Sequence, residues 1–195
     1  MGSEIAPELG AATPQRGNAL SAGLGGWALR LSGWRFDGAI PNVAKGVVIV
    51  APHTSNWDFP LGVAAMFALG LRAVYLGKHT LFNRVLGPTM RWLGGVPVNR
   101  SSPGGVVTET VRLFNEREKM ILVLSPEGTR SAVERWKTGF YRIAVEAGVP
   151  IIPVAFDWGL RRIRIGNCFE PTGDVAGDLE VLGAFYADVE GRRRG

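Results

Sequence analysis

Short runs of Val, Ile and Leu alternate along this chain with longer segments of helical character, and this alternation constrains the fold more than any other feature. Strands are expected at residues 47–51, 73–77, 95–99, 121–124 and 151–156, and helices at about 59–70, 80–92, 104–118 and 138–147. Strands that alternate with helices indicate an α/β fold, in which a mixed, largely parallel sheet is flanked by helices.

Three further segments extend this pattern. Residues 34–38 indicate a short strand and turn, and residues 177–189 a closing helix. Arg and Ile alternate over residues 161–165 with a period of two, which suits a sheet strand with one solvent-exposed face. Within 80–92, the pair Gly87-Pro88 is expected to bend or break the helix.

The length of 195 residues suits one domain with a core that needs no disulfides. Residues 1–18 are rich in Gly, Ala and Pro without periodicity, so we expect a flexible N-terminal arm followed by one domain over residues 19–190. Residues 19–31 are apolar but contain three glycines that weaken a helix. This segment could pack on the domain or lie on a membrane, and the sequence leaves both open.

The composition excludes several classes of protein. Hydrophobic residues make up 46% of the chain and charged residues 20%, which excludes a disordered protein. Cys168 is the only cysteine and is expected to be packed, and His53 and His79 are the only histidines, so we expect no metal site and no cofactor. The aromatic residues do not interleave with basic ones, so no nucleic-acid partner is expected.

Membrane insertion is not expected either. The first residues carry acids and prolines where a signal peptide has a basic start and an apolar core. The longest apolar stretch, residues 59–71, is too short to span a bilayer.

The net charge of +5 is spread unevenly along the chain. Residues 59–108 contain no Asp or Glu, but they contain the cations Arg72, Lys78, Arg84, Arg91 and Arg100. Such a stretch suits an anionic membrane surface or a phosphorylated substrate, and equally a buried helical layer with solvated ends. The triplet at residues 192–194 is expected to be a solvated tail.

His53 and Asp58 stand where the strand at 47–51 should emerge into a loop. A carboxylate on one imidazole nitrogen fixes the tautomer and stabilises the imidazolium, so that the other nitrogen can act as a base. The alternative is a purely structural role, in which Asp58 only caps the helix that follows and His53 is an ordinary loop residue. The pair by itself does not decide between them.

Two more polar loops follow predicted strands. Glu127, Gly128, Thr129 and Arg130 come after the strand at 121–124, and Arg100 comes after the strand at 95–99. Glycine lets a ligand approach the backbone, and the guanidinium fork of arginine suits phosphate. If these strands are parallel, the loops meet His53 at one sheet edge, where ligands of open α/β sheets bind.

These motifs together resemble a known family. His53-x4-Asp58, residues 95–100, Pro126-Glu127-Gly128-Thr129-Arg130 and residues 149–154 occur in the order of the four motif blocks of the PlsC-like lysophospholipid and glycerol-phosphate acyltransferases. The resemblance spans about residues 45–156. The chain departs from the usual motifs at Pro52, where Asn is common, and at Ser125, where an aromatic residue is common. The second motif is also looser than usual at Asn99.

The resemblance implies roles for these residues. His53 would act as general base on an acceptor hydroxyl and Asp58 would orient it. Arg100 and Arg130 would hold the phosphate of the acceptor, and Glu127, Gly128 and Thr129 would shape its pocket. The reaction would transfer a fatty acyl group from an acyl-CoA or acyl-carrier protein to a lysophospholipid, with 1-acyl-glycerol-3-phosphate as the leading acceptor.

The resemblance also implies a location. A lysolipid acceptor resides in a bilayer, so we expect a cytoplasmic protein that associates peripherally with the inner face of the membrane. The candidate surface is the stretch 59–108, where the helix near 81–93 could present one apolar face. Two alternatives remain, which are acyl transfer to another lysolipid, amino-acid lipid or glycolipid, and a non-catalytic lipid- or phosphate-binding protein.

Overall fold

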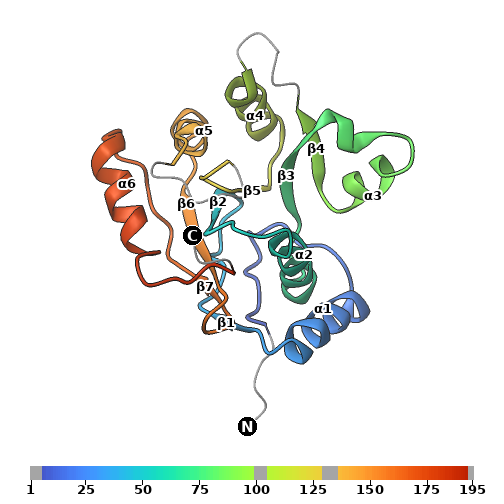
Figure 1. Ribbon diagram of the computed structural model, residues 1–195. Helices are drawn as coiled ribbons and strands as arrows, with labels where there is room; N and C mark the ends of the chain where they lie inside the picture. The colour runs from blue at the N-terminus through green and yellow to red at the C-terminus, as the bar shows by residue number, and fades with distance from the viewer. Residues whose placement is uncertain (1–5, 99–104, 129–135, 193–195) are drawn as a thin grey trace.

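A seven-stranded sheet forms the centre of the residues that the structure, a computed structural model, describes, which are 6–98, 105–128 and 136–192 (Figure 1). Its strands are β1 (Arg35–Asp37), β2 (Lys45–Ala51), β3 (Ala73–Lys78), β4 (Gly95–Val98), β5 (Met120–Leu124), β6 (Ile151–Asp157) and β7 (Arg162–Ile165). The helices are α1 (Ala19–Leu31), α2 (Asp58–Leu69), the 3-10 helix η1 (His79–Phe82), α3 (Gly87–Trp92), α4 (Gly105–Glu116), α5 (Gly139–Ala147) and α6 (Val175–Ala184).

The strand order is β1-β7-β6-β2-β5-β3-β4, and neighbouring strands are parallel except at β6 and β7. This confirms the predicted mixed, largely parallel sheet flanked by helices. Strand β2 lies between β6 and β5, with Val48 opposite Ile152 on one side and Val123 on the other. The parallel direction brings the carboxyl ends of β2 and β5 to the same edge. The loops that follow these two strands are therefore neighbours.

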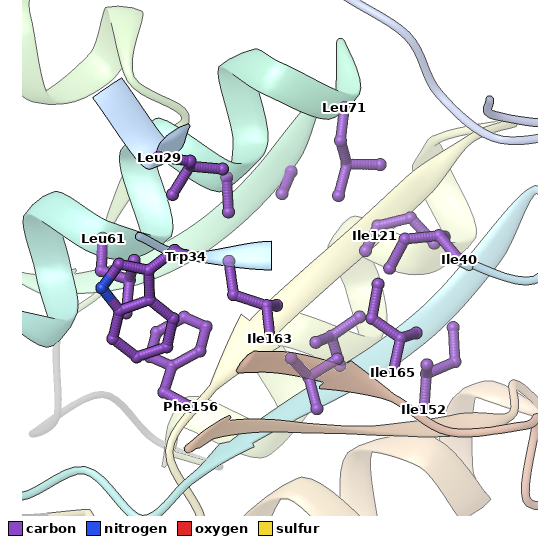
Figure 2. Packing of buried hydrophobic residues seen from close by; sticks show 14 residues of the cluster. Leu29, Trp34, Ile40, Leu61, Leu71, Ile121, Ile152, Phe156, Ile163 and Ile165 are labelled. Atoms are coloured by element: carbon purple, nitrogen blue, oxygen red, sulfur yellow. The ribbon is translucent and has the colours of Figure 1, made fainter. Parts of the chain in front are cut away.

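Two apolar cores cover the two faces of the sheet. Val48 belongs to the first core, whereas Val47 and Ile49 belong to the second, as the two-residue period of a strand requires. The first core lies against α1 and α2, and Figure 2 shows its packing around Trp34 and Phe156. The second lies against α4, α5 and α6. Since residues such as Val47 are fully buried, each contributes about 1.5–3 kcal/mol to folding.

Helix α1 forms in spite of its glycines. Asn18 and Ser21 close its N-terminus with a capping box, in which each side chain accepts a hydrogen bond from the other's backbone N–H. Gly25 is needed where α1 packs on α2, because a Cβ atom at this position would lie 2.5 Å from the backbone nitrogen of Ala68. The segment therefore packs on the domain through a close contact between two helices (Figure 1).

The helix expected over residues 80–92 is broken before Gly87-Pro88, in line with the bend or break expected from this pair. The chain forms η1, a turn and then the short helix α3, which begins at Gly87 and has Pro88 in its first turn. Proline is tolerated there but cannot continue a helix from the preceding turn. As a result Val85 is exposed and Leu93 is buried, so this region does not present one apolar face.

The two ends of the described chain both contact the domain. In the N-terminal segment, Arg16 pairs with Gly70 through backbone atoms, and the backbone N–H of Ala12 donates to the side chain of Asn42. The division of the chain at residue 18 remains a prediction.

Helix α6 ends at Ala184 rather than near residue 189. Within the three described ranges, none of the helices combines the length and the apolar character needed to cross a bilayer.

Candidate active site

His53 and Asp58 lie side by side at the carboxyl edge of the sheet. His53 follows the end of β2, and Asp58 is the first residue of α2. Nδ1 of His53 lies 3.2 Å from Oδ2 of Asp58. The Asp58 side chain is 1% exposed, whereas that of His53 is 24% exposed. A buried carboxylate thus faces an imidazole that solvent and small molecules can reach, which is the arrangement that a histidine base requires.

Among the described residues, three groups outside α2 contact the carboxylate of Asp58. Besides His53, the backbone N–H of Ser55 donates to Oδ2 over 2.9 Å, and the indole Nε1–H of Trp158 donates to Oδ1 over 2.9 Å. The residue that precedes α2, Trp57, forms no side-chain cap. Asp58 therefore binds the loop that carries His53 and the residue that follows β6. The capping alternative would instead have its side chain bind the backbone of α2.

Glu127 holds the other side of the histidine loop. Its Oε2 accepts a hydrogen bond of 2.8 Å from the backbone N–H of His53. This carboxylate is buried, and burial raises its pKa although the hydrogen bond from His53 acts in the opposite direction. Gly128 follows with a φ of +65°, a left-handed conformation that favours glycine. The predicted neighbours Glu127 and His53 are thus joined directly, through a backbone group that no motif specifies.

The other predicted residues are not placed. Arg100, Thr129 and Arg130 lie outside the residues that the structure describes. Arg130 follows two residues after Gly128 in the sequence. Strand β4, which precedes Arg100, is the edge strand, and β5 and β3 separate it from β2.

An apolar cavity of about 330 Å³ opens beside the pair. It lies between α2 and the sheet, and both His53 and Asp58 line it. Deeper in, its walls are residues of the first core, which include Phe156, Ile163 and Ile165 (Figure 2). The size and lining are those of a site for an apolar small molecule or chain. Among the described residues, no group of three or more His, Cys, Asp or Glu side chains is placed to hold a metal ion.

The C-terminal segment also reaches this site, which the sequence did not predict. The carbonyl of Glu190 accepts a hydrogen bond of 2.8 Å from the backbone N–H of Trp158. The guanidinium of Arg192 lies 4.8 Å from the ring centre of Trp57 and 4.9 Å from that of Trp158. Arg192 is exposed, as expected for a solvated tail, and its guanidinium is in addition attracted to the two indole rings.

Tyr186, just beyond α6, joins the two strands that carry the site. Its hydroxyl donates to the carbonyl of Ile49 on β2 over 2.9 Å and accepts from the backbone N–H of Val154 on β6 over 3.2 Å. Burial strongly raises the pKa of Tyr186, so the hydroxyl stays protonated and both bonds persist. No motif marks this residue. A tyrosine just after a helix gives no signal in the sequence that it will bridge two strands.

Comparisons with known proteins add independent information. A family model described as "Acyltransferase" matches residues 30–157. The 1-acyl-sn-glycerol-3-phosphate acyltransferase of Escherichia coli K12 is 31% identical over 127 residues, which cover 62% of this chain and 50% of that protein. The human 1-acyl-sn-glycerol-3-phosphate acyltransferase beta is 33% identical over 146 residues, covering 67% of this chain and 51% of the relative. The chain thus spans about half the length of the curated relatives it matches.

A solved structure is similar as well. The 1-acyl-sn-glycerophosphate acyltransferase PlsC of Thermotoga maritima superposes with a TM-score of 0.60 at 20% sequence identity, over 89% of this chain and 80% of that one. At this identity the likeness concerns the fold alone. It agrees with the largely parallel sheet described above.

Proposed function

This chain belongs to the acyltransferase family, and on that premise we propose that it transfers a fatty acyl group from an acyl thioester to the hydroxyl of a lysophospholipid. The acceptor that we favour is 1-acyl-glycerol-3-phosphate, because bacterial and human relatives are named for it. The product would be phosphatidic acid. The donor would be an acyl-CoA or an acyl-carrier protein, bound as a co-substrate.

The observation that carries this proposal is the His53–Asp58 pair at the wall of an apolar cavity. Asp58 contacts Nδ1 and so leaves Nε2 of His53 to accept a proton. A base beside an apolar cavity suits a reaction in which a hydroxyl becomes a nucleophile and a hydrocarbon chain must be accommodated. Acyl transfer to a lipid hydroxyl needs both.

The proposed step balances without a covalent enzyme intermediate. Nε2 of His53 takes the proton from the acceptor hydroxyl while its oxygen attacks the thioester carbonyl carbon. The tetrahedral adduct collapses, the carbon–sulfur bond breaks, and the thiolate takes the proton back from His53. Asp58 stabilises the imidazolium between these two events. A positioned base of this kind contributes about 10²–10⁴-fold to the rate.

The phosphate of the acceptor would be bound by the arginines that follow β4 and β5. We assign this role to Arg100 and Arg130, with Glu127, Gly128 and Thr129 forming the wall between phosphate and histidine. Arg130 is the stronger candidate, since it follows three residues after Glu127 in the sequence, and the Glu127 carboxylate holds the His53 backbone. The acyl chain would occupy the apolar cavity, in contact with the first core.

Peripheral attachment to the inner face of the membrane is part of the proposal. Leu20, Leu24, Trp27 and Leu31 of α1 expose between 61% and 79% of their surface. Their spacing of four, three and four residues puts them along one side of the helix. This face lies away from the α1–α2 contact and is apolar enough to enter a bilayer interface.

Vesicle flotation tests this attachment. Leu24→Glu should lower binding to vesicles that contain anionic lipid, because it places a charge in the exposed apolar row. Val181→Glu is the matched control, since Val181 is 60% exposed on α6, on the opposite face of the sheet. Equal binding by both variants and the unchanged protein would rule out α1 as the attachment site.

The central test is a panel of acceptors and donors. Purified protein is incubated with acyl-CoA and 1-acyl-glycerol-3-phosphate, thiol release is followed, and the lipid product is identified by mass spectrometry. Phosphatidic acid should accumulate in step with free thiol. Turnover only with another lysolipid, an amino-acid lipid or a glycolipid would change the acceptor, and no turnover with any of them would indicate a binding protein.

A variant of Arg130 tests the assignment of the phosphate. Arg130→Ala should raise the KM for 1-acyl-glycerol-3-phosphate by about 10-fold or more, because a charge-assisted contact to phosphate is lost. The KM for the thioester should change little. An equal loss with an acceptor that lacks a phosphate would contradict this role.

A further inference from the structure

Asp58 uses both of its oxygens, and the two oxygens face different parts of the molecule. Oδ2 lies 3.2 Å from Nδ1 of His53 and accepts a hydrogen bond from the Ser55 backbone, both within the histidine loop. Oδ1 accepts from the indole of Trp158, which is 100 residues away in the sequence. The torsion that turns a carboxylate about its Cβ–Cγ bond is soft, so contacts on one oxygen alone do not fix its plane. The indole supplies the second point that fixes it.

The indole is itself held in place by the C-terminal segment. Trp158 follows β6 directly, and its backbone N–H donates to the carbonyl of Glu190. Arg192 lies over its ring face at 4.9 Å. An indole N–H can only donate and does not titrate, so its bond to Asp58 is present at any pH at which the fold is intact. This contact therefore gives the carboxylate a fixed orientation that does not depend on proton transfer.

We propose that Trp158 is a positioning residue for the acyl transfer, which holds the Asp58 carboxylate in the plane that orients His53. The inference rests on the proposed function. It goes beyond the family match, which ends at residue 157, so that Trp158 and the C-terminal segment that holds it lie outside the matched residues. Trp158 acts through Asp58 and is not among the residues that line the cavity.

The first test is Trp158→Phe, which keeps an aromatic ring and removes the N–H. We expect kcat to fall about 10-fold, since a hydrogen bond to a buried charged group is lost, and KM for both substrates to stay within about twofold. Trp34→Phe is the matched control. Trp34 packs edge-on against Trp158 at 4.9 Å in the same core, so this change reduces aromatic packing and leaves the indole N–H of Trp158 in place. It should lower the melting temperature while kcat stays within about twofold.

A double-mutant cycle with Asp58→Ala separates positioning from a general structural effect. If Trp158 acts through Asp58, then Trp158→Phe should change the residual kcat of Asp58→Ala by less than about twofold. A further 10-fold loss in that background, an unchanged kcat in the single variant, or a change confined to KM would each overturn the proposal.

A measurement on the unaltered Trp158 covers the case in which Trp158→Phe does not fold. The indole proton of Trp158 is assigned by NMR, and it should shift and exchange faster with water in Asp58→Ala than in the unchanged protein. The indole protons of tryptophans distant from Asp58 should stay in place, and an unmoved Trp158 resonance contradicts the contact. This readout needs no turnover, so a chain inactive on every lysolipid would refute the proposed function while the resonance still decides whether the indole holds Asp58.

Discussion

Two buried aspartates, Asp58 and Asp178, have similar hydrogen-bond surroundings, but we assign them different roles. Each lies in the first turn of a helix, α2 and α6 respectively, where a negative charge is favoured. They are 2% and 4% exposed. Each accepts one hydrogen bond from a backbone N–H in the preceding loop and one from an aromatic side chain. For Asp58 these donors are Ser55 and Trp158, and for Asp178 they are Thr172 and Tyr141.

The difference lies in the remaining partner. For Asp58 it is the imidazole of His53, whose Nδ1 lies 3.2 Å from Oδ2 and which borders the cavity. For Asp178 it is the hydroxyl of Thr172, which does not titrate and lies within the same closed cluster. A buried carboxylate with only fixed donors ties α6 to α5. In the proposed mechanism, a buried carboxylate next to a histidine on a cavity wall is part of a proton-transfer system.

The hydrogen-bonded cluster of Asp178, Tyr141 and Thr172 favours one charge state of each titratable group. Burial opposes ionisation of Asp178, but the hydrogen bonds from Tyr141 and Thr172 outweigh it, and the pKa of Asp178 is lowered. Burial and the neighbouring Asp178 raise the pKa of Tyr141, so its hydroxyl remains a donor. In the physiological range the pair does not exchange a proton, and its role is limited to stability.

The largest expected effect comes from removing the residue that distinguishes the two sites. His53→Ala should lower kcat by about 10²–10⁴-fold, the contribution of a general base, while the melting temperature changes little because His53 is partly exposed. Initial rates with acyl-CoA and 1-acyl-glycerol-3-phosphate measure the first effect and circular dichroism the second. A folded variant with full activity would show that His53 is not the base.

Asp178→Asn should produce the opposite pattern. The amide cannot accept all the hydrogen bonds that the carboxylate accepts from Tyr141 and Thr172, so the melting temperature should fall by roughly 2–10 °C. The kcat of the folded protein should stay within about twofold. Thermal denaturation and initial rates at 20 °C below the new midpoint would measure both. A large loss of kcat without destabilisation would mean that the two aspartates do not divide their roles in this way.

Much of this contrast could not be predicted from the sequence, for a specific physical reason. The strands and the pair His53–Asp58 could be predicted because they are local patterns. A short apolar run indicates a strand, and the five-residue spacing indicates the pair, without reference to distant residues. The contact from Trp158 to Asp58 depends on how β6 aligns beside β2, and the bridge from Tyr186 depends on where α6 ends. Such distant contacts are decided by packing. The break in the helix expected at 80–92 was predictable in the same way as the strands, because Gly87-Pro88 is itself a local signal.

Tyr141→Phe is the counterpart of Trp158→Phe, since each removes one aromatic donor from a buried aspartate. The Tyr141 hydroxyl donates to Asp178 and accepts from the backbone N–H of Gly173, so its loss should lower the melting temperature by roughly 2–6 °C. It should leave kcat unchanged within about twofold, because Tyr141 is remote from the cavity wall. The same melting and rate measurements apply. Equal effects of the two variants on kcat would remove the distinction between the clusters.

The smallest expected effect is on the pH dependence of folding stability, in which Asp178 and Glu127 should differ. The lowered pKa of Asp178 contributes stability that is present above about pH 4 and is lost as the pH falls through its folded-state pKa. The pKa of Glu127 is raised by burial, so its contribution is present below about pH 4 and is lost as the pH rises through its folded-state pKa. The two carboxyl groups should therefore affect stability with opposite signs as the pH rises.

Melting temperatures measured from acidic to neutral pH test this opposition. The deficit of Asp178→Asn relative to the unchanged protein should grow as the pH rises. Glu127→Gln, whose amide oxygen can still accept from the His53 N–H, should gain relative to the unchanged protein over the same change, by a few degrees at most. If both differences moved in the same direction, the pKa of Glu127 would be lowered rather than raised in the folded protein. The carboxylate would then be stabilised in place by the histidine loop, much as Asp178 is by Tyr141.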